Sequence, residues 1–339
     1  MNILYGENVL NVIAEGKVPF VVSTMPEVWR IVKDDIGGFP EKVIFVRSME
    51  KSYIQTVENS VPGVNFVFGI GGGSAIDFAK YIAWKRKLPL TTVPSIVSVD
   101  AAVTKEVAIR ESGKVRYIGK VMPEAILVDF SLIKKGPKTL NRAGIGDIIS
   151  IHTALFDWRL AYQRGCERYD EIIARDAQRL INSLKESIYE IREVTNEGIK
   201  KLMELFLQAN TLCWKFGNSR PEEGSEHFFA YNMEYLTKKH FIHGELVCLG
   251  VIIMSYFQEN NLEEIFEIIK KAGALYRPAE IGTDWNEVLK CLLTLKDYVI
   301  EESLPYCIMN EVKKNRIAKS LDALQKIIET ESCSSEGKR

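Results

Sequence analysis

Short apolar runs alternate with helical patterns over the first 130 residues of the chain. The runs are rich in β-branched residues, and the segments between them are long enough for crossover helices. This alternation is typical of βαβ units, in which helices connect the strands of a parallel sheet. The expected strands are 18–23, 42–46, 65–69, 90–93 and 125–128, and the expected crossover helices are 26–37, 50–60 and 74–87.

Helical periodicity replaces this alternation from about residue 140 onward. Long segments such as 169–193, 196–216 and 262–272 carry apolar residues at three-and-four spacing, with charged residues between them. The last nine residues are small and polar and have no periodicity. We therefore expect an α/β domain with a parallel sheet over residues 1–140, an all-α domain over 141–330, and a frayed tail over 331–339.

Composition narrows the class of protein. A chain of 339 residues is long enough for two domains with their own cores. Lys and Arg number 44 against 45 Asp and Glu, which argues against a nucleic-acid-coating protein. The six cysteines show no CxxC pair or metal-ligand spacing, which indicates reduced thiols. No export signal is apparent, and the longest apolar stretch is about half the length of a membrane span. We expect a cytoplasmic protein with no nucleic-acid partner and no membrane span, and a homo-oligomer is admitted.

A glycine cluster follows the third expected strand and opens the third expected helix. Residues 69–80 read GIGGGSAIDFAK. The consecutive glycines expose backbone N–H groups and permit positive φ, and the helix N-terminus adds partial positive charge. A pyrophosphate could bind in this strand–loop–helix context, which predicts that the α/β domain binds a dinucleotide. The alternative is a tight turn with a purely structural role.

This glycine cluster resembles the GGGSxxDxAK element of the superfamily of iron-containing alcohol dehydrogenases, glycerol dehydrogenases and dehydroquinate synthases. Other segments follow in the order of that superfamily: LTTVPSIVSVD at 90–100, GIGD at 144–147, DWRLA at 157–161, SRPEEGSEH at 219–227 and HGE at 243–245. DWRLA and SRPEEGSEH most resemble the sn-glycerol-1-phosphate dehydrogenase family. The resemblance covers roughly residues 15–260, and it implies a dehydroquinate synthase-like fold and a nicotinamide cofactor.

The cofactor residues implied by the resemblance lie mainly in the first two of these segments. The first two strands do not end in the carboxylate that NAD enzymes place against the ribose, and Arg47 could pair with a 2′-phosphate. Arg47 could equally be a solvated surface charge, so NAD and NADP both stay open. The implied cofactor-binding residues are Gly71, Gly72, Gly73, Ser74, Asp77, Thr92, Ser95, Thr104 and Arg47, with Thr92 and Ser95 on the adenine and ribose side.

Two of the four histidines fall within the quoted segments. Asp147, His227 and His243 would together supply one carboxylate and two imidazoles, a ligand set suited to Zn²⁺ or Fe²⁺ with an open coordination position. We expect one divalent metal ion, with Zn²⁺ favoured and Fe²⁺ or Ni²⁺ admitted, that polarises a carbonyl while hydride moves. Taken singly, Asp147 could cap a helix, His227 could lie in the core, and His243 could be a loop residue.

The expected substrate residues are Asp100, Arg220 and Tyr231, and Asp100 joins the three metal ligands as a catalytic residue. Asp100 can orient a hydroxyl, and the Arg220 guanidinium can bind a phosphate bidentately unless its turn only positions His227. Two positions depart from the family pattern. Tyr231 replaces the second histidine of EHxxSH, and a phenol exchanges protons poorly near neutrality. Ala101 replaces a glycine beside Asp100.

These features predict a metal-dependent NAD(P)H oxidoreductase that reduces a small phosphorylated ketone. The family resemblance implies dihydroxyacetone phosphate as substrate and sn-glycerol 1-phosphate, a phospholipid precursor, as product. One alternative is a cyclase or lyase like dehydroquinate synthase, although that branch typically carries Glu at the first ligand position and a GHxxGHAxE segment. The other is a repurposed homologue, either non-catalytic or acting on another polyol or ketone.

Overall fold

The computed structural model describes residues 2–12 and 19–330, and it forms two compact units. The first unit comprises Met1–Gly144 and Tyr189–Asn210, and the second comprises Ile145–Ile188 and Thr211–Arg339. Residues 189–210 thus belong with the α/β unit, although their helical pattern assigned them to the all-α domain. Periodicity reveals that a segment is helical, but not the element against which it packs. The expected frayed tail, 331–339, lies outside the described residues.

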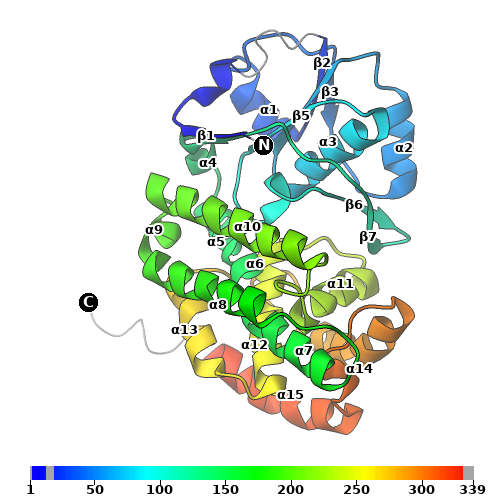
Figure 1. Ribbon diagram of the computed structural model, residues 1–339, viewed down its shortest axis with the longest axis vertical. Coiled ribbons are helices and arrows are strands. Elements are labelled where there is room, and N and C mark those ends of the chain that lie inside the picture. The colour runs from blue at the N-terminus through cyan, green and yellow to red at the C-terminus, as the bar shows by residue number, and fades with distance from the viewer. Residues whose placement is uncertain (1, 13–18, 331–339) are drawn as a thin grey trace. The chain divides into compact units, whose positions relative to one another are not determined.

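A six-stranded parallel sheet forms the centre of the first unit (Figure 1). Its strand order is β1–β8–β5–β4–β2–β3, and every pair in it is parallel. The strands are β1 (Asn2–Gly6), β2 (Phe20–Thr24), β3 (Lys42–Phe45), β4 (Phe66–Gly71), β5 (Leu90–Pro94) and β8 (Ala125–Asp129). The fold class expected from the sequence is therefore confirmed. Strand β1 and the separate hairpin β6 (Glu106–Glu111) and β7 (Lys114–Lys120) were not expected.

Both faces of this sheet are covered by apolar cores. Successive residues of a strand point to opposite sides, so each strand contributes side chains to both cores. Val21 and Val67 face a core that includes residues of α2 and α3. Phe20 and Phe68 face the opposite core, with residues of α1 and α4, and their rings meet edge to face at 5.2 Å. The helices of this unit are α1 (Pro26–Val32), α2 (Lys51–Asn59), α3 (Gly73–Arg86), α4 (Phe130–Lys135), α5 (Lys138–Ala143) and the short 3₁₀ helices η1 (Val9–Val12) and η2 (Asp100–Ala102).

All regular secondary structure among the described residues of the second unit is helical. Helix α12 is apolar on all sides and almost completely buried, so it forms the centre against which α6, α7, α11 and α13 pack. The helices are α6 (Ile145–Ile149), α7 (Ile151–Gln163), α8 (Glu171–Glu186), α11 (Ser225–Thr237), α12 (His243–Gln258), α13 (Leu262–Ala272), α14 (Trp285–Glu301), η3 (Ile308–Asn310) and α15 (Lys314–Glu329). Helices α9 (Ile188–Glu193) and α10 (Asn196–Phe216) each include residues of both units.

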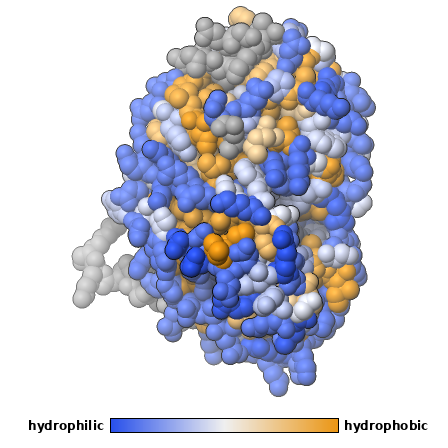
Figure 2. Space-filling view, viewed as in Figure 1, coloured by the Kyte–Doolittle hydropathy of each residue, from blue (hydrophilic) through white to orange (hydrophobic). Residues whose placement is uncertain are grey.

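Hydrophilic side chains cover much of the molecular face in Figure 2, with smaller apolar areas between them. Among the helices that the structure describes, none combines the length and the apolar character that crossing a bilayer requires.

Candidate active site

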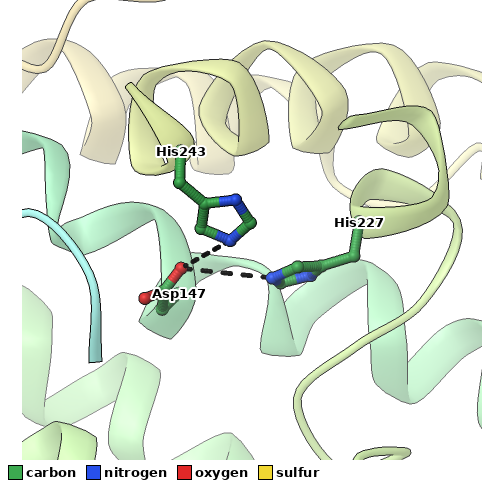
Figure 3. A group of neighbouring side chains, drawn as sticks. All are labelled: Asp147, His227 and His243. Carbon is green, nitrogen blue, oxygen red and sulfur yellow. Dashed lines mark ion pairs between the residues drawn. The ribbon is translucent and has the colours of Figure 1, made fainter. Parts of the chain in front are cut away.

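Asp147, His227 and His243 come together in the second unit from three different helices, α6, α11 and α12 (Figure 3). Asp147 Oδ1 lies 3.4 Å from His243 Nε2 and 4.0 Å from His227 Nε2. All three potential ligand atoms lie within 4.8 Å of one another. Tetrahedral coordination at about 2.0–2.2 Å would place neighbouring ligand atoms about 3.3–3.6 Å apart. A small decrease in the distances between the three ligand atoms would therefore allow them to coordinate one metal ion.

The cluster is largely enclosed. The side chains of Asp147 and His227 are each only 4% exposed, whereas that of His243 is 31% exposed. Solvent or a small molecule can thus approach from the His243 side, which leaves room for an exchangeable fourth position.

Glycine contacts bring the three ligand helices close together. A Cβ atom on Gly146, next to Asp147, would lie 2.4 Å from the carbonyl oxygen of Gly244, next to His243. A Cβ atom on Gly250 would lie 2.8 Å from the carbonyl oxygen of Glu226, next to His227. Real Cβ atoms essentially never approach backbone atoms this closely. The absence of side chains at Gly146 and Gly250 therefore allows α6 and α11 to pack onto α12 at ligand-bearing positions.

Glu226 orients the His227 imidazole. Its completely buried carboxylate accepts hydrogen bonds from His227 Nδ1 at 2.9 Å, from Gly224 N at 2.6 Å and from Thr153 Oγ1 at 2.7 Å. The Nδ1 bond directs Nε2 toward Asp147, as an outer carboxylate does for a ligand histidine. Burial lowers the pKa of His227, but the bond to Glu226 and nearby carboxylate charges outweigh it and raise this pKa to about 9. The neighbouring carboxylates therefore give the site a negative electrostatic potential, which favours a cation.

Asp157, in the DWRLA segment, fixes the start of the helix that carries His227. Its buried carboxylate accepts from Ser225 N at 2.8 Å and from Ile308 N at 2.7 Å. Burial and the charge of Glu226 raise the pKa of Asp157 to about 6. Asp157 therefore connects α7, the amino end of α11 and η3.

Arg220 lies in the interior of the second unit. Its side chain is almost completely buried, and its Nη2 donates to the carbonyl oxygen of Tyr306 at 3.0 Å. Its charge also attracts the Asp157 carboxylate, whose pKa it lowers against the effect of burial. This burial is compatible with the alternative in which the segment positions His227, and the phosphate role of Arg220 stays a prediction.

Tyr231 is also buried, one helical turn beyond His227 on α11. Its ring centroid lies 6.1 Å from that of His227, and its hydroxyl donates to Glu223 Oε1 at 3.3 Å. Sequence reasoning did not single out Glu223, because only its contact with Tyr231 connects it to the ligand group.

In the first unit, the glycine cluster lies at the carboxyl end of β4. Strand β4 adjoins β2, and the chain order reverses between them: β3 lies beyond β2, whereas β5 and β8 lie beyond β4. Open parallel sheets bind nucleotides in the crevice at such a switch point. Arg47 follows β3, Gly71 ends β4, Gly72–Ser74 follow it, and Ser95 follows β5, so these predicted cofactor residues share the carboxyl edge of the sheet.

The backbone angles of the cluster differ from the expectation in one respect. Only Gly71 has a positive φ, +154°, and a Cβ there would lie 2.7 Å from Ala75 Cβ. Gly72 is extended, with φ −81°, and precedes Gly73, the first residue of α3. The turn thus requires glycine at residue 71, whereas positive φ does not explain the glycine at 72 or 73.

Three other predicted cofactor residues have partners inside the first unit. Thr92 is completely buried and donates to the carbonyl oxygen of Ala102 at 3.0 Å, which leaves it poorly placed to meet a nucleotide. Asp77 Oδ1 and Thr104 Oγ1 both accept from the completely buried Lys80 Nζ, at 3.2 and 2.5 Å. Lys80, the last residue of GGGSAIDFAK, was not identified as a site residue. It connects the nucleotide-side helix to the loop after η2.

Asp100 begins η2 and is partly exposed. Its Oδ2 accepts from Asn210 Nδ2 at 2.7 Å, and Asn210 also donates to the carbonyl oxygen of Phe206 at 3.0 Å. Asn210 is buried on α10 and holds the Asp100 carboxylate in one orientation. No motif indicated this partner, which lies 110 residues from Asp100 in the chain.

Comparisons with known proteins agree with this architecture. Residues 28–137 match the model of the iron-containing alcohol dehydrogenase family. The NAD(P)+ glycerol-1-phosphate dehydrogenase of Sulfolobus acidocaldarius is 31% identical over 281 residues, 81% of this chain and 80% of that protein. That of Metallosphaera sedula is 32% identical over 284 residues, with the same shares covered.

Solved structures show the same fold. A probable glycerol dehydrogenase from Sinorhizobium meliloti superposes with a TM-score of 0.74 at 17% identity over 97% of both chains. Glycerol dehydrogenase from Schizosaccharomyces pombe gives 0.74 at 18% identity, over 97% of this chain and 90% of that one. The resemblance found in the motifs is confirmed, and the chain belongs to the glycerol-1-phosphate dehydrogenase family.

Proposed function

We propose that this protein is a metal-dependent NAD(P)H oxidoreductase of the cytoplasm that reduces dihydroxyacetone phosphate to sn-glycerol 1-phosphate. The observation that carries the proposal is the Asp147–His227–His243 cluster, in a chain whose relatives are glycerol-1-phosphate dehydrogenases. A bound nicotinamide would supply the hydride for this two-electron reduction, and solvent or a protein group the proton, with NAD(P)+ as the oxidised product.

The residues of the cluster fit a divalent metal ion. One carboxylate and two imidazoles are the donor set that Zn²⁺ and Fe²⁺ accept, and Glu226 supplies the outer hydrogen bond typical of a ligand histidine. We infer that Asp147, His227 and His243 hold the ion, with Zn²⁺ favoured. When bound, such an ion supplies Lewis-acid polarisation of a carbonyl.

The remaining roles fall to residues of the first unit. The N–H groups of Gly72 and Gly73, at the start of α3, would bind the dinucleotide pyrophosphate, and Ser74, Ser95 and Arg47 would line the nucleotide. Asp100, held by Asn210, would orient a substrate hydroxyl.

The test is a turnover assay of the metal-loaded protein with dihydroxyacetone phosphate and either NADPH or NADH. We expect oxidation of the nicotinamide that depends on the ketone and is lost after chelation and restored by Zn²⁺ or Fe²⁺. The product should resist a dehydrogenase specific for sn-glycerol 3-phosphate. No ketone-dependent oxidation with any of these metals would contradict the proposal, as would a product of the opposite configuration.

A further inference from the structure

Glu223 and Tyr231 lie on the two sides of His227 in the sequence, four residues before it and four after it, and they meet in the structure. Tyr231 Oη donates to Glu223 Oε1 at 3.3 Å, and Ser219 Oγ donates to Glu223 Oε2 at 2.9 Å. Each oxygen of the carboxylate therefore has a hydroxyl partner. An oxygen of this kind keeps a second lone pair, so the oriented carboxylate can accept a further hydrogen bond.

The pair is close to the metal ligands. The Tyr231 ring lies 6.1 Å from the His227 ring, and both residues lie on α11, one helical turn apart. Glu223 is partly exposed, unlike the buried Glu222 and Glu226 beside it. Among the described residues, no Lys or Arg forms an ion pair with Glu223. Its charge is thus available to a molecule that approaches the cluster.

We propose that Glu223, oriented by Tyr231, recognises the free hydroxyl group of the substrate, on the side of the ketone opposite the phosphate. The inference rests on the proposed function. A carboxylate accepts a hydrogen bond from a hydroxyl and repels a phosphate. The two arms of dihydroxyacetone phosphate are therefore distinguished by charge: the hydroxymethyl arm faces Glu223, and the phosphate arm points away from it.

This role gives a reason for tyrosine at residue 231. The phenol of Tyr231 donates a hydrogen bond to the Glu223 carboxylate. Tyr231 thus acts as a positioning residue, whereas Glu223 contacts the substrate. The substitution of the family histidine then changes substrate recognition without removing a metal ligand.

The test compares dihydroxyacetone phosphate with acetol phosphate, which carries a methyl group in place of the free hydroxymethyl group. The ratio of kcat/KM for the two ketones is measured for the metal-loaded wild type and for Glu223→Gln. We expect the wild type to prefer dihydroxyacetone phosphate about 10- to 100-fold, the range for a hydrogen bond to a charged group. The preference should fall about tenfold in Glu223→Gln, because a neutral hydrogen bond replaces a charged one. Tyr231→Phe should reduce it partly.

Two variants on α11 serve as controls. Glu234→Gln and Tyr235→Phe make the same chemical changes further from His227, and both should keep the wild-type ratio. Loss of metal would lower both kcat/KM values together, so metal content is measured in each preparation. A wild type that does not distinguish the ketones, or a Glu223→Gln variant that keeps the preference, would overturn the inference while leaving the proposed function intact. Reduction of neither ketone would instead refute the proposed function.

Discussion

Replacement of Glu226 by Gln tests whether this carboxylate holds His227 as a metal ligand. The variant keeps the size and shape of the side chain. Its amide oxygen, placed at the Oε1 position, could still accept from Gly224 N and His227 Nδ1. Its amide nitrogen, at the Oε2 position, would face Thr153 Oγ1, which can accept a hydrogen bond from it instead of donating one. The substitution therefore removes the charge and leaves most of the geometry.

The size of the effect follows from this change of charge. A hydrogen bond to a charged group contributes about 1.5–3 kcal/mol, and a neutral one about 0.5–1.5 kcal/mol. The loss of about 1–1.5 kcal/mol corresponds to about tenfold weaker metal binding, which lies in the range known for outer carboxylates. Glu226→Ala removes all three hydrogen bonds and should weaken binding by about 100-fold or more.

Competition with a chromophoric chelator measures these affinities directly. Glu234→Gln, on the same helix, is the matched control and should bind Zn²⁺ like the wild type. If Glu226→Gln and Glu226→Ala both bound Zn²⁺ with wild-type affinity, then Glu226 would not support a metal ligand.

Three further predictions concern other parts of the chain. Gly71→Val should abolish measurable NADPH binding in fluorescence titrations, because residue 71 has φ +154° and a side chain there would meet Ala75. The control Gly63→Val, at a position with open space, should bind NADPH normally, and equal affinities of the two variants would refute the role of Gly71. Arg220→Ala should lower the Tm and reduce turnover of phosphorylated and unphosphorylated ketones in parallel, because the Arg220 side chain is buried against Tyr306. A loss confined to the phosphorylated ketone would instead show that Arg220 binds the substrate phosphate. Burial lowers the pKa of His152, so its stabilising contribution is present above about pH 6.5 and is lost as the pH falls through the lowered value. Urea unfolding between pH 7 and 5 should therefore show a steeper loss for the wild type than for His152→Gln, and identical slopes would contradict this.

Local sequence was sufficient for the main fold but not for all of its elements. The strands of the parallel sheet were predictable because each is a short β-branched run between helical patterns, and their burial on both faces produces that composition. Strand β1, at the sheet edge, is half exposed, and the two strands of the β6–β7 hairpin both begin and end with charged residues, so neither has that pattern.

The candidate site shows the same limit at the level of side chains. Asp147, His227 and His243 were identified because motifs place them, and the structure brings them together. The supporting residues were not identified. Thr153, which holds Glu226, is 73 residues from it in the chain, and Asn210, which holds Asp100, is 110 residues from it. Such contacts depend on how helices pack, which local periodicity does not specify. The burial of Arg220 was not predictable, because a charged residue beside a motif gives no indication of its burial, and its phosphate role stays a prediction.

The central claim is that Asp147, His227 and His243 hold one catalytic metal ion. An anomalous difference map, recorded at the Zn absorption edge from crystals of the active, Zn²⁺-loaded enzyme, tests it most directly. We predict a single peak per chain about 2.0–2.2 Å from Asp147 Oδ1 and from Nε2 of both histidines, and no peak in crystals of inactive His243→Ala. A peak elsewhere in the chain, or active crystals with no metal between these three side chains, would contradict the account.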